Sequence, residues 1–400
     1  MSVIFSEVQK DMLKLLSAAL WKEDIDDLDI TNFSEINAEL KNQTVQVLVS
    51  DLIEKTDISS SEITEYVKLV GQNYLIFHTL MYDQQELTHL FEETGIPVAV
   101  LKGAAAAVYY PVPEYRQMGD IDIIVEPENF EKAYHLMCEH GYHAEQELSE
   151  VSRHAGFETP SGIEVELHRC FSTNINKKKK QILDQCIYKG ISQAEKHIVA
   201  DYTVPILPVS ENGLVLLAHI NRHLSSGLGL RQIIDWMMYV HHNLDDEIWE
   251  NTFSETADAI GMKTLAETVT YLCKKYLGLS DRITWCDNAD DELADELMLY
   301  ILDKGNFGRK NEYGSRTTVS VLHYFYNPIS AFTYLTAGGM IHWKAAKKYK
   351  ILKYFAWIYQ IGHLIRMGLK RKSGMEVFSE ELAQSGKEAK LLQRLGVTGL

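Results

Sequence analysis

A change in hydrophobic periodicity near residue 96 constrains the fold of this 400-residue chain most strongly. Up to that point apolar residues recur at helical spacing, and short apolar runs replace them afterwards. The run GIPVAVLKG, bracketed by glycines, predicts a buried strand, and IDIIV predicts a second one. Helices are predicted at AAAAVYY and NFEKAYHLMCEHGY, and a hairpin at HAGFET and IEVELH around Pro160, Ser161 and Gly162. Residues 96–172 therefore predict a compact α/β unit.

Apolar residues at helical spacing on both sides of this unit divide the chain into three regions. Residues 1–95 form the predicted N-terminal helical region and residues 173–400 the predicted C-terminal helical region, with no internal repeat. We expect an α+β fold that is mostly α-helical, in which a small mixed sheet is flanked by the two helical regions. With 46% hydrophobic residues, the chain can bury a core of that size.

Two aspartates lie in the second predicted strand. Side chains at positions i and i+2 of a strand point to one face, so Asp120 and Asp122 project together while Ile121 and Ile123 face the core. Two carboxylates at this spacing, about 6–7 Å, suit a divalent cation, because without one their repulsion would raise one pKa or destabilise the strand. The simpler interpretation is a solvated strand end without a role.

The predicted strand IEVELH carries more side chains of the ligand type. Glu164, Glu166 and His168 share one face of it. Pairing of this strand with IDIIV would place a third carboxylate beside Asp120 and Asp122.

Three residues nearby suit a phosphate. Lys102 and Gly103 stand where a strand ends and a helix begins, and free N–H groups at a helix N-terminus together with a lysine favour phosphate binding. Arg116, four residues before Asp120, has the planar guanidinium that binds phosphate oxygens in a bidentate way. Taken singly, a solvated lysine and an arginine paired with an acid are the simpler interpretations.

The segments VLKGAAAAVYYP, YRQMGDIDIIV, RHAGF and IEVELH together resemble the successive motifs of the nucleotidyltransferase-like family of bacterial proteins, within the DNA polymerase β-type nucleotidyltransferase superfamily. The resemblance implies that Asp120, Asp122 and Glu166 bind two Mg²⁺ ions, which hold a nucleoside triphosphate (NTP) and activate an acceptor hydroxyl. The chain departs from the family at one point. The usual Gly-Ser pair about ten residues before the acidic pair is replaced by Lys102 and Gly103, 17 residues before Asp120.

A later helical segment carries four further polar residues. His219 and His223 are spaced i,i+4, which suits a metal, but the glutamate of a zinc-protease motif is missing. Arg231 and Asp235 share that spacing and are expected to form an ion pair. Packing roles compete with an alternative in which this helix lines the cleft and a histidine or Arg231 contacts the nucleotide. The resemblance also places His154 near the site, where a surface histidine is the competing interpretation.

Charge is distributed unevenly along the chain. The formal charge of -17 argues against general binding to nucleic acid backbones. The segment Lys344–Leu400 has 12 Lys+Arg against 4 Asp+Glu, a local +8, which leaves -25 for the rest. Within it, the stretch KAAKKYKILKYFAWIYQIGHLIRMGLKRK predicts an amphipathic helix packed on the body, with RNA binding or a peripheral membrane contact as alternatives.

Cysteine content and hydropathy bear on the compartment. Five scattered cysteines without a CxxC pair favour a reducing compartment, and the N-terminus does not resemble a signal peptide, so we expect a cytoplasmic protein. The long uncharged run Thr317–Trp343 contains Asn327, Pro328 and a glycine pair, and we interpret it as core helices and a turn without stable membrane insertion.

These observations favour an Mg²⁺-dependent nucleotidyltransferase that uses an NTP. A noncatalytic nucleotide-binding or scaffold protein in a biosynthetic or defence assembly is the rival interpretation. A zinc hydrolase built on His219 and His223 is a third. Small-molecule, RNA and protein acceptors all fit the same carboxylates, and the sequence selects neither the nucleobase nor the oligomeric state.

Overall fold

The computed structural model describes residues 5–25, 30, 32–148, 152–171, 175–224 and 227–306. Beyond these it describes residues 332, 335–336, 338–340, 342–343, 345–346, 350–370, 386–388 and 390–396. The chain forms two compact units, Met1–Lys310 and Asn311–Leu400.

A seven-stranded mixed sheet is the centre of the first unit. The strand order is β3-β4-β5-β2-β1-β7-β6, and β2 pairs with β5, and β1 with β7, in parallel, while the other pairs are antiparallel. The strands are β1 (Val98–Leu101), β2 (Asp120–Val125), β3 (His143–Ala144), β4 (His154–Glu158), β5 (Glu164–His168), β6 (Glu195–Val199) and β7 (Tyr202–Ile206).

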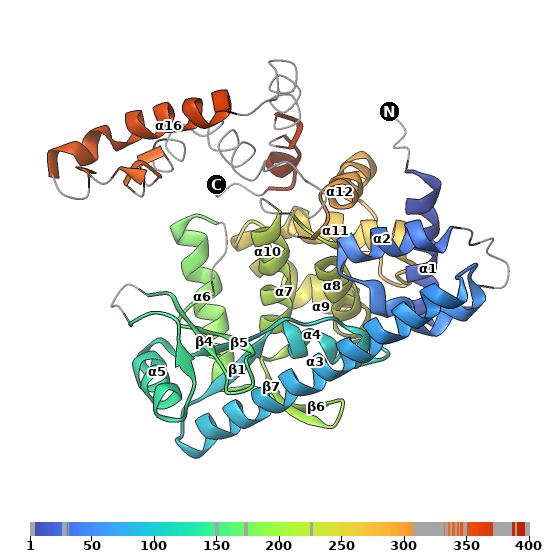
Figure 1. Ribbon diagram of the computed structural model, residues 1–400, viewed down its shortest axis with the longest axis horizontal. Coiled ribbons are helices and arrows are strands. Elements are labelled where there is room, and N and C mark those ends of the chain that lie inside the picture. Colours follow the sequence, from blue (N-terminus) through green and yellow to red (C-terminus); the bar gives the residue numbers. More distant parts are fainter. Residues whose placement is uncertain are drawn as a thin grey trace. The chain divides into compact units, whose positions relative to one another are not determined.

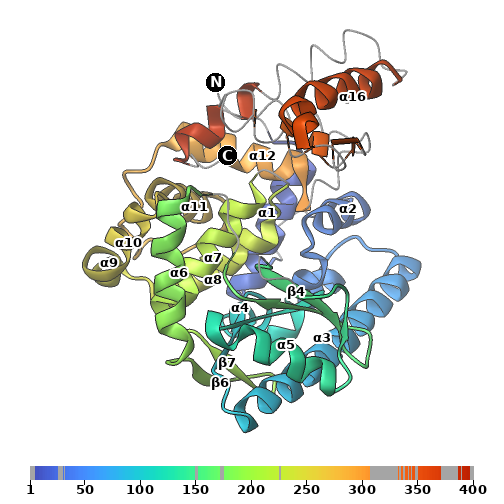
Figure 2. The ribbon, with the colours of Figure 1, turned by 90° about the vertical axis from the view of Figure 1, so that its left-hand side faces the viewer.

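Helices cover both faces of the sheet (Figures 1 and 2). One face is apolar, because Ile121 and Ile123 of β2 and their neighbours pack against α3 (Ser60–Glu93) and α5 (Phe130–Glu139). On the other side lie α6 (Lys177–Ile191), α7 (Val209–His223) and α8 (Leu230–Asn243), as Figure 2 shows. The period-two alternation of β2 and β5 therefore turns their acidic residues toward the second group of helices.

The long helix α3 begins at a capping box. The side chain of Ser59 accepts from the backbone N–H of Glu62, and the Glu62 carboxylate accepts from the backbone N–H of Ser59. Phe77 and Met81 are buried against the sheet, whereas Val67 and Tyr74, which lie at helical spacing from them, are 59% and 52% exposed. The helix extends beyond the sheet it covers, so its first half buries less of that face.

The remaining helices of this unit pack against α8, against α3 and against one another. α1 (Glu7–Trp21) lies against α11 (Lys263–Leu277), and the indole N–H of Trp21 donates to the carbonyl of Leu277 over 2.6 Å. The other elements are α2 (Phe33–Gln43), η1 (Gln46–Lys55), α4 (Gly103–Ala107), η2 (Pro113–Tyr115), η3 (Pro127–Asn129), α9 (Asp246–Ile248), η4 (Trp249–Phe253), α10 (Ser254–Ala259) and α12 (Asp291–Lys304).

The second unit contains η6 (Lys350–Phe355) and α16 (Ala356–Lys370). α16 is amphipathic, as expected, and its Tyr359 stacks on Trp343 with ring centroids 5.0 Å apart. Residues 317–331 of the long uncharged run lie outside the described residues. Among the described helices, none is both long and apolar enough to cross a membrane.

The predicted fold class is confirmed, since a mixed sheet is embedded in a mostly helical chain. The strands at β1 and β2, the helices α4 and α5 and the β4–β5 hairpin also lie where the sequence predicts them. One expectation is wrong. The hairpin of β6 and β7 lies in the predicted C-terminal helical region, and β7 joins the sheet beside β1, so the sheet continues past residue 172 to Ile206. All five cysteines are free.

Candidate active site

The two acidic strands lie side by side in the sheet. β2 and β5 run parallel, with Asp120 opposite Glu164 and Asp122 opposite Glu166. Because residues in register point to one face, the four carboxylates gather on the side that faces α6, α7 and α8. The expected pairing of these strands is confirmed. The Asp122 side chain is only 4% exposed and that of Glu166 33%, while Asp120 is exposed at the start of its strand.

Lys102 occupies a turn of unusual backbone conformation at the end of β1. Its φ is 54° and that of Gly103 is 27°, in the left-handed region that residues with a Cβ rarely adopt. The turn leads from β1 into α4, as the sequence predicts. The Lys102 ammonium nitrogen lies 2.7 Å from Oδ1 of Asp122, and the Phe171 ring lies 6.0 Å from it. In this structure Lys102 therefore neutralises Asp122.

His168 joins the two carboxylates. Its Nε2 lies 2.8 Å from Oδ1 of Asp122 and 3.3 Å from Oε2 of Glu166. The three ligand atoms all lie within 4.8 Å of one another, close enough to hold one metal ion. The Nδ1 of His168 is buried and has no hydrogen-bond partner within the described part of the chain. Burial alone would lower the pKa of His168, but the hydrogen bonds to Asp122 and Glu166 raise it above its ordinary value.

The surrounding charges separate the carboxylates into two groups. Burial alone would raise the pKa of Asp122, but the charge of Lys102 and the hydrogen bond from His168 hold it well below its usual range. The pKa of Glu166 is lowered, chiefly by the hydrogen bond from His168. The pKa of Asp120 is raised, first because the surrounding protein removes water from its carboxylate, and second because the charge of Asp122 repels it. Asp122 and Glu166 are thus held as anions.

Arg116 is placed differently from the expected phosphate clamp. Its Nε lies 3.0 Å from Oδ1 of Asp235 and its Nη2 2.7 Å from Oδ2, a bidentate pair in which both side chains are almost fully buried. The hydroxyl of Tyr110 also donates to Oδ1 of Asp235, over 2.8 Å. Arg116 therefore anchors the turn before β2 to α8 instead of presenting its guanidinium to a ligand.

The expected ion pair between Arg231 and Asp235 is wrong, because Arg116 takes both oxygens of Asp235. Nη1 of Arg231 instead donates to the carbonyl of Gln117 over 3.1 Å, which brings the guanidinium to the turn before β2. The local i,i+4 spacing is overruled by a contact between residues 119 positions apart.

The histidine pair of α7 is buried beside the site. The rings of His219 and His223 meet edge to face with centroids 4.5 Å apart. Burial, followed by the charge of Lys102, lowers the pKa of His223 to about 3 and that of His219 well below its usual value, so both rings are neutral. The metal-type cluster found among the described residues includes neither histidine, so the structure offers no support for a zinc site on this pair.

His154 lies at the edge of the site. It starts β4 directly opposite His168, and the two rings lie 5.9 Å apart between centroids. Its side chain is exposed, so it is accessible to a ligand that approaches over β4.

Sequence reasoning missed two residues of this arrangement. His168 was placed on the acidic face but not among the ligands, although the E-x-E-x-H alternation already carried that signal. Asp235 was assigned to the wrong arginine, and no local signal identifies Arg116 as its partner.

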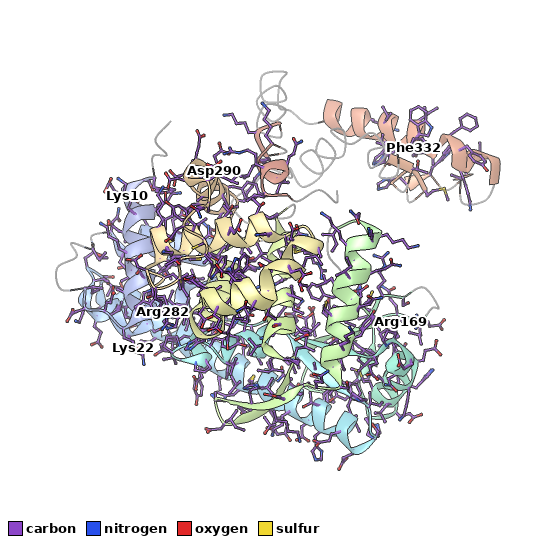
Figure 3. The ribbon with its side chains drawn as sticks, turned by 180° about the vertical axis from the view of Figure 1, so that it is seen from behind. Lys10, Lys22, Arg169, Arg282, Asp290 and Phe332 are labelled. Atoms are coloured by element: carbon purple, nitrogen blue, oxygen red, sulfur yellow. The ribbon has the colours of Figure 1, made fainter. Side chains whose placement is uncertain are left out.

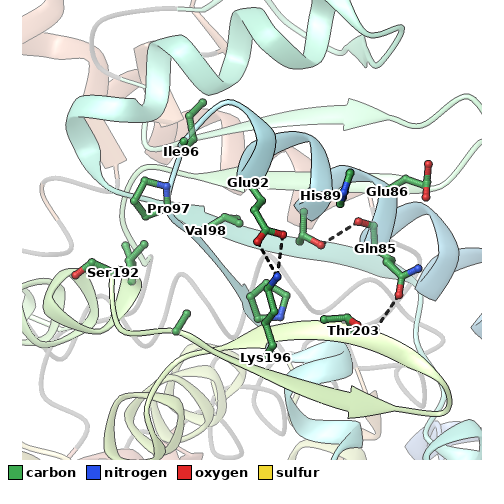
Figure 4. Close-up of a pocket in the computed structure, with 15 residues that line it drawn as sticks. Gln85, Glu86, His89, Glu92, Ile96, Pro97, Val98, Ser192, Lys196 and Thr203 are labelled. Carbon is green, nitrogen blue, oxygen red and sulfur yellow. Dashed lines mark hydrogen bonds and ion pairs between the residues drawn. The ribbon is translucent and has the colours of Figure 1, made fainter.

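A cavity of about 740 Å³ lies away from the acidic residues of β2 and β5 (Figure 4). It is lined by the end of α3, the start of β1 and the β6–β7 hairpin, and an ion pair between Glu92 and Lys196 crosses it with 2.7 Å between Oε1 and Nζ. Val98 of its wall begins β1, whereas Lys102 follows the end of that strand. Size favours this cavity, but the clustered carboxylates, lysine and histidine favour the acidic face of the sheet as the reactive site.

Comparisons with known proteins point to one family. The model of a family described as "Uncharacterised nucleotidyltransferase" matches residues 31–278. No curated protein matches the chain. Among solved structures, an antigenic nucleotidyltransferase-like protein from Paracoccidioides brasiliensis is similar, with 15% sequence identity and a TM-score of 0.34. The alignment covers 51% of this chain and 94% of that chain, and a likeness of this size supports no argument about this molecule.

Proposed function

This chain belongs to the uncharacterised nucleotidyltransferase family, and on that premise we propose that it transfers a nucleoside monophosphate from an NTP to an acceptor and releases pyrophosphate. The observation that carries the proposal is the register of β2 and β5, which sets Asp122 opposite Glu166 with His168 beside both. A buried aspartate beside a half-buried glutamate, supported by a lysine at a strand-to-helix turn, suits phosphoryl chemistry better than a structural role.

The residues present fit Mg²⁺. Asp120, Asp122 and Glu166 supply carboxylate oxygens, the hard ligands that this ion prefers, and we propose that they hold two ions. The ammonium of Lys102 already places a positive charge on Asp122, as a cation would. Bound Mg²⁺ supplies charge neutralisation on the phosphates and lowers the pKa of the acceptor hydroxyl.

The protein's own side chains have separate tasks in this proposal. Lys102 and the N–H groups at the start of α4, beginning at Gly103, hold the phosphates at the end of β1. His168 orients the carboxylates of Asp122 and Glu166 through its Nε2 hydrogen bonds. The acceptor oxygen forms a bond to the α-phosphorus while the bond to the β-phosphate oxygen breaks, and pyrophosphate leaves. We propose that His154, exposed at the start of β4, contacts the nucleotide.

Labelling identifies the activity and the acceptor together. The full chain is incubated with each α-labelled NTP and a fractionated lysate, with Mg²⁺ or with a chelator. We expect label to enter one fraction, with one pyrophosphate released per label, only when Mg²⁺ is present. Transfer that continues at the same rate in the chelator would rule out a metal-dependent site.

A noncatalytic nucleotide-binding protein is the second candidate. The pairing of Lys102 with Asp122 favours it, because a site whose buried acid is already neutralised can bind a nucleotide without a metal. Calorimetry with ATP, GTP, CTP and UTP separates the two. Binding of an NTP that persists in the chelator, together with no transfer to any lysate fraction, would favour the scaffold.

A further inference from the structure

Two arginines compete for one buried carboxylate beside the acidic face. Arg116 takes both oxygens of Asp235, and Tyr110 donates a third hydrogen bond to it. Arg231, one turn away on the same helix, makes no ion pair with Asp235 among the described residues. Arg231 keeps its positive charge without an ion pair within 4.0 Å in the described part of the chain.

The guanidinium of Arg231 lies at the turn that leads into β2. Nη1 donates to the Gln117 carbonyl over 3.1 Å, three residues before Asp120, and the side chain is partly exposed. Its Nε is buried and has no hydrogen-bond partner among the described residues. A donor in this state costs free energy unless an acceptor arrives, so the guanidinium has unused hydrogen bonds beside the catalytic strand.

Backbone N–H groups at the start of α8 are the other donors that an anion could use here. At the start of α8, the backbone N–H of Gly229 donates to Oε1 of Gln232 over 3.2 Å, and that of Leu230 to Oε1 of Gln43 over 3.0 Å. These two backbone donors are occupied, whereas the buried Nε of Arg231 has no acceptor among the described residues.

We propose that Arg231 forms an anion subsite for a phosphoryl group, between α8 and the turn that leads into β2. The assignment rests on the proposed function and names the residue that takes the phosphate role expected of Arg116. The planar fork of a guanidinium matches two phosphate oxygens, and a phosphoryl group would accept hydrogen bonds from donors that Asp235 does not take. The anion belongs either to the bound NTP or to free pyrophosphate, the product.

Calorimetry on the full chain with Mg²⁺ tests the subsite, using ATP, GTP, CTP, UTP and inorganic pyrophosphate as probes. Arg231→Gln should weaken binding of the preferred NTP about tenfold or more, because it removes charge-assisted hydrogen bonds, and Arg231→Lys should lose less. Arg282→Gln is the matched control. Arg282 donates to the carbonyl of His241 near the other end of α8, and Figure 3 shows it across the view from Arg169, the residue that follows His168.

The outcomes separate the claims. A parallel loss for pyrophosphate assigns the subsite to the leaving group, and a loss for the NTP alone assigns it to the phosphate that is transferred. Unchanged affinity of Arg231→Gln for both probes overturns the inference while NTP binding by the wild type upholds the proposed function. Absence of NTP binding by the wild type removes both.

Thermal unfolding distinguishes a binding residue from a structural one. Arg231→Gln removes a cation that Arg116 repels, so its melting temperature should equal or exceed that of the wild type. A drop as large as that of Arg116→Gln would show that Arg231 holds the fold together and would overturn the assignment.

Discussion

Arg116→Gln tests the buried ion pair between Arg116 and Asp235, which Arg231 does not share. In the wild type, Nε and Nη2 of Arg116 contact Oδ1 and Oδ2 of Asp235 at 3.0 and 2.7 Å, and the side chains are 4% and 1% exposed. Glutamine is too short to reproduce the bidentate geometry and carries no charge. Asp235 would remain buried with the hydroxyl of Tyr110 as its remaining donor from this cluster.

The expected loss is large. Removing one partner of a buried pair costs about 3–5 kcal/mol, because the other charge is left without compensation. In a unit of this size each kcal/mol lowers the melting temperature by about 2 °C, so we expect a fall of about 6–10 °C. Arg116→Gln combined with Asp235→Asn should recover part of it, since both charges are then absent.

Thermal unfolding followed by circular dichroism measures the effect. Arg282→Gln serves as the control, because this exposed arginine donates one hydrogen bond to a carbonyl and should cost about 1 kcal/mol or less. A fall in Arg116→Gln no larger than in this control would refute the reasoning. It would mean that Arg231 moves to Asp235, and the anion subsite would lose its basis.

Three other predictions follow from separate parts of the molecule. Gly213→Ala should destabilise the protein by about 1–3 kcal/mol in urea unfolding, because its Cβ would meet a tyrosine ring of α8 at 2.3 Å, whereas Gly71→Ala, with nothing within 4 Å, should be neutral or stabilising. Asp57 accepts hydrogen bonds from two backbone N–H groups at the start of α2, and these bonds, chiefly that from the helix's first residue, lower its pKa from 3.8. Its contribution to the free energy of unfolding is therefore present above pH 3.8 and is lost as the pH falls through the lowered pKa. Urea titrations of Asp57→Ala should therefore differ from wild type at pH 6 and converge with it in acid; a constant difference would contradict this. Lys102→Met should bind Mn²⁺ alone more tightly in electron paramagnetic resonance, because no ammonium competes for Asp122, and should bind NTPs more weakly; weaker Mn²⁺ binding would contradict the competition.

The acidic face was predictable because it depends on local alternation. Asp120 and Asp122 share a face by the two-residue period of a strand, and the same period places Glu166 and His168 together. Pairing of the two strands then follows from the need to bury the apolar side of both. The sequence predicted a third carboxylate beside the first two, and the structure supplies the parallel register that sets Asp122 opposite Glu166.

The contacts of Arg116 and the β6–β7 hairpin were not predictable by the same means. Arg231 has the favourable local spacing to Asp235, but the turn before β2 brings Arg116 to this carboxylate instead. The hairpin turns through Ala200 and Asp201, whose φ values are 47° and 73°. Such a turn is usually signalled by Asn-Gly or Gly-Gly, so the sequence lacks the residues by which it would be recognised.

Transfer by Asp122→Asn tests the central claim most directly. The substitution keeps the shape of the side chain and removes the charge that Lys102 and His168 contact. Glu195→Gln, on the edge strand β6, is the matched loss of a carboxylate away from the site. Label transfer and pyrophosphate release should fall on the order of 10²-fold or more in Asp122→Asn and stay unchanged in Glu195→Gln. Undiminished transfer in Asp122→Asn would contradict the assignment of the active site to β2 and β5.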